Sequence, residues 1–265
     1  MDLHLQDRHV LITGGSKGIG LACTLGFLQE GARVSLVSRD AGHLTQARDT
    51  LRGQFADAAD RIGLYPADLR DPASAVAALD AAEAAFGPVD VLVNSAGAAR
   101  RAAPADLDAA AWHAAMDAKY FTYIHMLDPA VKRMAARGQG AIVNVVGMGG
   151  KVANPAHMAG GAANAALMLV SAGMAAAYGP RGVRVNAVNP GLTLTARLQQ
   201  GLEADAKVQG IAPEAALRQA TARMPLGRVA EPEEIANAVV FLASPRASYI
   251  TGAILAMDGA VTPMI

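Results

Sequence analysis

Short apolar runs alternate along the chain with longer stretches in which apolar residues recur every three or four positions. The short runs have the length of buried strands, and the longer ones have the period of helices that cover a sheet. This alternation predicts an α/β protein with a doubly wound parallel sheet of seven strands, flanked by helices. The expected strands are Arg8–Thr13, Arg33–Ser38, Ile62–Pro66, Val89–Val93, Ala141–Val146, Val183–Val188 and Ala253–Ala256.

Helices are expected between these strands, and two of them have clear starts. Pro72 and Pro232 each follow an acidic residue, and proline suits the first turn of a helix because its missing N–H is not needed there. No linker, repeat or low-complexity tract divides the chain, so residues 1–265 are expected to form one domain. The least periodic stretch, 192–223, follows the sixth strand, where a substrate lid would lie. The expected helices are Ile19–Glu30, His43–Gly53, Pro72–Phe86, Ala105–Ala136, Ala156–Tyr178 and Pro232–Ala243.

Charge and composition argue against several classes of protein. The chain carries 23 basic and 23 acidic residues, so no net field would attract nucleic acid or an anionic membrane. Cys23 is the one cysteine, which excludes an internal disulfide, and the scattered histidines give no metal site. The first residues show no signal pattern, and no run of 18 apolar residues occurs. We therefore expect a cytoplasmic protein that acts on a small molecule.

A glycine-rich turn joins the first expected strand to the first expected helix. It reads Thr13-Gly14-Gly15-Ser16-Lys17-Gly18-Ile19-Gly20. The glycines at 14, 18 and 20 allow a tight turn, the approach of backbone amides to a pyrophosphate and close packing of the helix on the strand. The N-terminus of the helix then faces the phosphate charge. Because the motif lies between a strand and a helix, we interpret it as a dinucleotide site rather than an ordinary turn.

Further motifs follow this turn at regular points along the chain. They are Asp68-Leu69, Asn94-Ser95-Ala96-Gly97, Arg184 to Gly191 with Thr195, Pro225-Leu226-Gly227-Arg228 and Thr251-Gly252 to Asp258-Gly259. In order and spacing they resemble the short-chain dehydrogenase/reductase family over nearly the whole chain. The resemblance implies a single Rossmann-type domain that binds a nicotinamide dinucleotide. The positions that resemble cofactor contacts are Gly14, Ser16, Lys17, Gly18, Ile19, Gly20, Ser38, Arg39, Asp68, Leu69, Asn94, Ala96, Gly97, Pro190, Gly191, Thr193 and Thr195.

The end of the second strand bears on the choice of dinucleotide. An acidic residue at that point binds the adenosine ribose and repels a 2′-phosphate, but this strand ends Val37-Ser38-Arg39. Arg39 offers a fork for phosphate, and Lys17 adds a second cation in the glycine-rich turn. Asp40 stands next to Arg39 and is able to point toward the ribose, which leaves NAD(H) open. The residues favour NADP(H).

The sequence departs from the family at the positions of its catalytic residues. That family uses an Asn, a Ser, a Tyr and a Lys, and the Lys lowers the pKa of the Tyr that exchanges a proton with the substrate. Alignment on the flanking motifs places Lys119 at the Asn, Gly147 at the Ser, Gly160 at the Tyr and Asn164 at the Lys. No tyrosine has a lysine four residues later, so a shift of register does not restore the pair.

Lys119, Asn164 and His157 are the candidates for a rebuilt acid–base site. Lys119 and Asn164 stand exchanged relative to the family, so Lys119 is expected to point inward toward Asn164; a side chain that reaches solvent is the alternative. His157 lies three residues before Gly160 and either exchanges a proton near neutral pH or caps a helix. Two adjacent glycines at 160 and 161 inside a helix indicate a need for space or close backbone approach, or else drift.

Three functions fit these residues. The first is an NADP(H)-dependent oxidoreductase with a rebuilt site and very weak activity on simple ketones. The second is a non-redox enzyme on the same pocket, and the third is a binding or regulatory protein that does no chemistry. The resemblance favours the first. The segment 192–223 sets the substrate, and its mixed side chains suggest only a medium-sized, partly apolar molecule.

The resemblance also implies a homotetramer, or a homodimer, with two-fold axes. The expected contacts are the helices 105–136 and 156–178 and the last strand. Small side chains on the second of these helices suit close helix–helix approach: Ala162, Ala163, Ala166 and Ala175.

Overall fold

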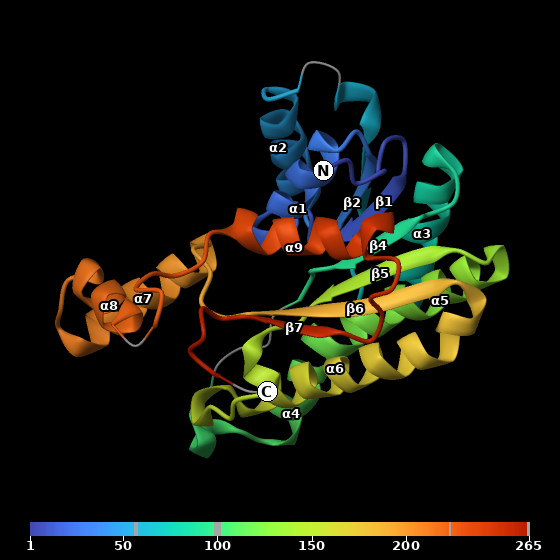
Figure 1. Cartoon of the computed structure of the whole chain (residues 1–265). Coiled ribbons are helices and arrows are strands. Elements are labelled where there is room, and N and C mark those ends of the chain that lie inside the picture. The colour runs from blue at the N-terminus through green and yellow to red at the C-terminus, as the bar shows by residue number, and fades with distance from the viewer. Residues whose placement is uncertain (56–57, 98–101, 223, 264–265) are drawn as a thin grey trace.

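The structure is a computed structural model, and it describes residues 1–55, 58–97, 102–222 and 224–263. Its strands are β1 (His9–Thr13), β2 (Arg33–Ser38), β3 (Ile62–Pro66), β4 (Val91–Asn94), β5 (Gly140–Val145), β6 (Val183–Pro190) and β7 (Ile254–Met257). Within these described residues they form one seven-stranded sheet in the order β3–β2–β1–β4–β5–β6–β7, and every pair is parallel (Figure 1). The predicted sheet is confirmed.

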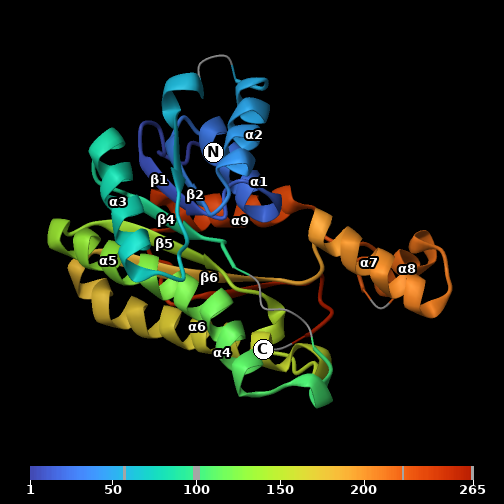
Figure 2. The ribbon, with the colours of Figure 1, turned by 180° about the vertical axis from the view of Figure 1, so that it is seen from behind.

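Helices cover both faces of the sheet (Figures 1 and 2). The main ones are α1 (Gly18–Gln29), α2 (Ala41–Arg52), α3 (Pro72–Phe86), α5 (Thr122–Arg137), α6 (Met158–Tyr178) and α9 (Pro232–Ala243). On one face α1, α2 and α9 bury Phe27, Leu44 and Val239 in a core with the sheet. On the other face α3 and α5 bury Leu79 and Met126, and α6 packs against β6. The strand order reverses between β1 and β4, so a crevice opens at their carboxyl ends.

The single helix expected over 105–136 is wrong. The chain forms α4 (Ala109–Met116), a π-helical turn (Asp117–Phe121) and then α5. The carboxylate of Asp108 accepts a hydrogen bond from the amide of Ala111, which fixes the later start. At the π turn the hydroxyl of Thr122 donates to the carbonyl of Asp117 at 2.9 Å. Such local widening of a helix often marks a functional site.

Two helices that the sequence did not predict lie in the segment 192–223. They are α7 (Ala196–Gln209) and α8 (Pro213–Thr221), and they project from the body of the protein (Figures 1 and 2). Among the residues of these helices whose burial is described, only Ala206 and Ala216 are buried, whereas the leucines Leu198, Leu202 and Leu217 are half-buried. A helix held by so narrow an apolar contact gives a weak periodic signal in the sequence.

By length and composition alone, the helical stretch Pro155–Arg181 could cross a membrane, because its mean hydropathy is 1.4. The sequence predicted no membrane span. Here this stretch is a helix of the fold, because Leu167, Ser171 and Ala175 are buried along one side. The opposite side is apolar and open, and Leu169 is 76% exposed. The small-residue face named from the sequence is therefore partly wrong, since Ala163 and Ala175 face the core and Ala162 is exposed.

Candidate functional site

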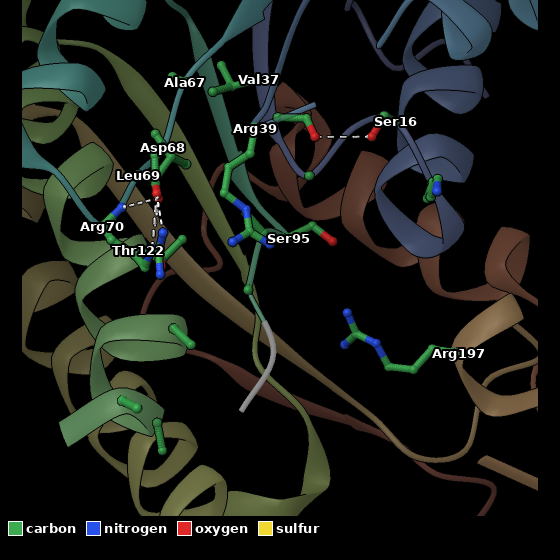
Figure 3. A pocket seen from close by; sticks show the side chains of 18 of the residues that line it. Ser16, Val37, Arg39, Ala67, Asp68, Leu69, Arg70, Ser95, Thr122 and Arg197 are labelled. Carbon is green, nitrogen blue, oxygen red and sulfur yellow. Dashed lines mark hydrogen bonds and ion pairs between the residues drawn. The ribbon is translucent and has the colours of Figure 1, made fainter. Parts of the chain in front are cut away.

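A cavity of about 880 Å³ lies at the carboxyl ends of β1, β2 and β4 (Figure 3). It is the crevice that the strand order creates. Nine of the expected cofactor contacts line it: Gly14, Ser16, Lys17, Ser38, Arg39, Asp68, Leu69, Ala96 and Gly97. The opposite wall consists mainly of small apolar side chains from α4, the π turn and the first turn of α6, and Arg197 reaches in from α7 (Figure 3).

The glycine-rich turn needs its glycines for close packing. A Cβ on Gly14 would lie 2.9 Å from the Cα of Ala96, and Gly14 has a φ of 69°, which favours glycine. A Cβ on Gly20 would lie 2.2 Å from the carbonyl oxygen of Gly14. Helix α1 begins at Gly18, and no side chain caps its first amides. These amides are the donors that suit a pyrophosphate.

Three basic side chains stand at the β2 end of the cavity. Lys17 Nζ lies 2.8 Å from Nε2 of His43, and Arg39 also lines the cavity. Asp40 is occupied elsewhere: its carboxylate accepts a hydrogen bond from the amide of His43 at 2.9 Å and caps α2. Asp40 is not among the residues that line the cavity, whereas the basic side chains Lys17, Arg39 and His43 are. Such a cluster suits a phosphate group.

Asp68 follows the end of β3, and its carboxylate is hydrogen-bonded to Arg70. The guanidinium of Arg70 donates to both carboxylate oxygens (Figure 3). This hydrogen bond lowers the pKa of Asp68 below its ordinary value. The described lining keeps an excess of positive charge, because Asp68 is its one carboxylate beside the four cations Lys17, Arg39, Arg70 and Arg197.

The other expected cofactor contacts lie outside this cavity. Asn94 is fully buried and ties strands together, since its amide donates to Asn144 at 3.0 Å and its oxygen accepts from Thr13 at 3.3 Å. Thr195 and Gly18 line a neighbouring pocket of about 300 Å³. The remaining residues of the set, Ile19, Gly20, Pro190, Gly191 and Thr193, are not among the residues that line this cavity.

Lys119 lies inside the protein, in the π turn, and its side chain is 7% exposed. Its ammonium donates to the phenol oxygen of Tyr123 at 2.8 Å and to the carbonyl of Val145 at 3.1 Å. Burial, assisted by the charge of Arg197, lowers the pKa of Lys119 to about 7. The expectation that Lys119 points inward is confirmed, but its partners are Tyr123 and Val145 rather than Asn164.

His157 and Asn164 both lie close to Gly149, and His157 also lies close to Gly160. A Cβ on Gly160 would lie 2.2 Å from Cε1 of His157, so the imidazole fills the space that a side chain at position 160 would take. Asn164 is 6% exposed, and its Oδ1 has no hydrogen-bond partner among the described residues. A Cβ on Gly161 would lie 2.7 Å from the carbonyl oxygen of Gly149. Close backbone approach therefore accounts for Gly161, and contact with an imidazole accounts for Gly160.

Sequence reasoning missed four residues of this region: His43, Arg70, Tyr123 and Arg197. Two of them carried a local signal, because His43 stands in the first turn of α2 beside Arg39 and Arg70 lies two residues after Asp68. A search for tyrosine followed by lysine also overlooked the reverse order, Lys119 followed by Tyr123. Arg197 gave no signal, because the helix that carries it was not predicted.

A doubly wound sheet with a glycine-rich turn and basic side chains at its switch point defines a nucleotide-binding α/β protein. Residues 14–262 match the family model described as enoyl-(acyl carrier protein) reductase. A curated relative, 2-(S)-hydroxypropyl-CoM dehydrogenase 3 from Xanthobacter autotrophicus, is 38% identical over 99% of this chain and 99% of its own. The chain belongs to the short-chain dehydrogenase/reductase family.

Solved structures agree with this assignment. L-sorbose reductase from Gluconobacter frateurii, complexed with NADPH and L-sorbose, matches with a TM-score of 0.93 at 30% identity, over 100% of both chains. A short-chain oxidoreductase from Pseudomonas aeruginosa, bound to NADPH, matches with a TM-score of 0.88 at 32% identity, over 98% of this chain and 100% of the other. That oxidoreductase is described as containing an atypical catalytic center.

Proposed function

We propose that this chain is an NADP(H)-dependent oxidoreductase that interconverts an alcohol and a carbonyl compound with a rebuilt acid–base site. One observation carries the proposal: the imidazole of His157 occupies the space that a side chain at position 160 would take, and it shares the surroundings of Gly149 with the amide of Asn164. Resemblance puts the proton-donating tyrosine of the family at position 160. His157 therefore stands where that family exchanges a proton with the substrate.

The cavity fits NADP(H). The glycine-rich turn and the uncapped start of α1 suit the pyrophosphate, whereas Lys17, Arg39 and His43 suit a 2′-phosphate. The Oδ1 of Asn164 has no hydrogen-bond partner among the described residues, so it could accept a hydrogen bond from a ribose hydroxyl. When bound, the nicotinamide supplies or accepts the hydride. The NADPH bound to the sorbose reductase and to the Pseudomonas oxidoreductase supports this choice.

The chain's own residues would then divide the remaining work. His157 gives a proton to the carbonyl oxygen in reduction and takes one from the alcohol in oxidation. Lys119 holds a second proton behind it, at the end of β5. Small apolar side chains on the α4 wall exclude water from a substrate of medium size, and Arg197 of α7 faces the cavity.

A hydride-transfer assay separates the three candidate functions. We expect purified protein to consume NADPH with carbonyl compounds from the classes that its relatives handle, starting with L-sorbose. A substrate changed without net NADPH consumption would instead support a non-redox enzyme on the same pocket. Tight NADPH binding with no change in any tested carbonyl or alcohol would support a binding or regulatory protein.

Arg39→Ala is expected to weaken NADPH binding by at least about tenfold and to leave NADH binding nearly unchanged, because a charge-assisted contact contributes about 1.5–3 kcal/mol. Titration of cofactor fluorescence measures both affinities. Arg48→Ala is the matched control, since Arg48 lies on α2 and pairs with Asp49 outside the cavity. Equal wild-type affinities for NADPH and NADH would overturn the choice of cofactor.

We also propose a homotetramer, or a homodimer, built on the open apolar side of α6. Leu169 is exposed in the middle of that side, and contiguous apolar surface of this kind is usually covered. Light scattering at micromolar concentration should give two or four times the chain mass, and Leu169→Glu should lower it. A monomeric wild-type mass would contradict the proposal.

A further inference from the structure

Lys119 and Tyr123 form a hydrogen-bonded pair one helical turn apart. The pair spans the junction of the π turn and α5, and the ring of Tyr123 also lies under the ammonium, 4.3 Å from its centroid. Both side chains are buried, with Tyr123 fully so. The proposed proton exchange gives Tyr123 no part, although its phenol contacts the ammonium of Lys119 directly.

The geometry fixes the direction of each hydrogen bond. Tyr123 donates its hydroxyl proton to the carbonyl of Val145, which leaves the phenol oxygen as acceptor for the ammonium. Lys119 also donates to Val145, so two of its three N–H groups are engaged at the end of β5. The amine is able to donate to both acceptors in either protonation state, but the two hydrogen bonds are charge-assisted, and therefore stronger, when Lys119 is protonated.

Little else nearby compensates the charge of this ammonium. Its electrostatic environment is dominated by burial and by Arg197 from α7, both of which oppose protonation. Besides Tyr120 and Tyr123, the titratable groups nearest along the chain are Asp117 in the same turn and His113 in α4. Strand β5 carries none, and α6 carries none before Tyr178. His125 of α5 is bonded instead to the carbonyl of Leu69. Tyr123 is thus the main support of the charged form.

We propose that Tyr123 is a positioning residue that holds the ammonium of Lys119 at the end of β5 and stabilises its protonated form. Near pH 7 a share of Lys119 then stays protonated, with one N–H that neither Tyr123 nor Val145 accepts. The use of that proton in turnover rests on the proposed function, but the pairing itself does not. Hydrogen bonding to a charged form favours that form, and removal of the phenol should release the proton at lower pH.

Lysine-selective isotope labelling tests this directly, because the chain has only five lysines. NMR titration should show Lys119 releasing its proton near pH 7, far below the other four. In Tyr123→Phe we expect the midpoint of Lys119 to fall by about one pH unit or more. Tyr120→Phe is the matched control, since Tyr120 lies in the same π turn and stacks edge-on against Phe121 instead.

An unchanged midpoint in Tyr123→Phe would overturn the proposal. If that variant does not fold, fluorotyrosine incorporated in the Tyr120→Phe background replaces it, because fluorination weakens the phenol as acceptor while keeping its shape. The midpoint should again fall, and no change would count equally against us. The titration needs neither substrate nor cofactor. A protein that shows the shift but never consumes NADPH would therefore refute the proposed function and leave this inference standing.

Discussion

Lys119→Met should make the protein markedly more stable at neutral pH. Burial lowers the pKa of Lys119 from 10.5 to about 7, so folding works against its charge. The full difference corresponds to about 5 kcal/mol below pH 7, at 1.4 kcal/mol for each pH unit. Methionine has a similar length and no charge. Val145 keeps a partner, because Tyr123 still donates to its carbonyl.

The sign of the pH dependence follows from proton binding. Between about pH 7 and 10.5 the unfolded chain keeps the Lys119 proton and the folded chain has lost it. The unfolded state then binds more protons, so wild-type stability should rise with pH across this window. The advantage of Lys119→Met should accordingly be largest below pH 7 and shrink toward pH 10.

Urea unfolding at pH 6.5 and pH 9 measures this difference, at one protein concentration because assembly also affects stability. Lys151→Met is the matched control, since Lys151 is exposed and should change little at either pH. A variant less stable than the wild type at pH 6.5 would mean that Lys119 is compensated in the folded state. If replacing this buried lysine raises the free energy of unfolding, the lysine is retained for function rather than for folding.

The sheet was predictable because both of its faces are buried. Strands such as Val91–Asn94 and Gly140–Val145 are nearly continuous apolar runs, and the observed strands begin or end within two residues of the expected positions. The glycine-rich turn was predictable for a related reason, because Gly14 and Gly20 leave no room for a Cβ. Close packing imposes residue types that can be recognised without coordinates.

The acid–base region was less predictable, because its contacts join segments that are distant in sequence. The alignment shows a glycine at 160, but only the fold shows that an imidazole three residues earlier fills its space. Likewise, Lys119 meets Val145 through the approach of the π turn to β5. The π turn was not recognised in the sequence either, and in the fold Gly97, more than twenty residues earlier, passes close to the carbonyl of Ala118 in this turn.

Restoring the family's catalytic residues should create a ketone reductase only when His157 is also removed. The four changes are Lys119→Asn, Gly147→Ser, Gly160→Tyr and Asn164→Lys. A side chain at 160 begins 2.2 Å from the present ring of His157, so the four changes alone place a tyrosine against an imidazole. Adding His157→Ala opens that space. Reduction of simple ketones should then rise by about a hundredfold or more over the wild type, the range of acid–base catalysis.

Steady-state NADPH consumption compares the wild type, the four-change variant and the five-change variant. A fourth protein carries the five-change set without Gly147→Ser, because Gly147 has a φ of 122° and a serine there is strained. NADPH affinity measured on each protein shows whether the cofactor site has survived. Equal activity in the four- and five-change variants would show that His157 does not block the restored tyrosine. A wild type that already reduces simple ketones as fast as the five-change variant would show that its own acid–base set is sufficient, and that the family's residues are not needed on this fold.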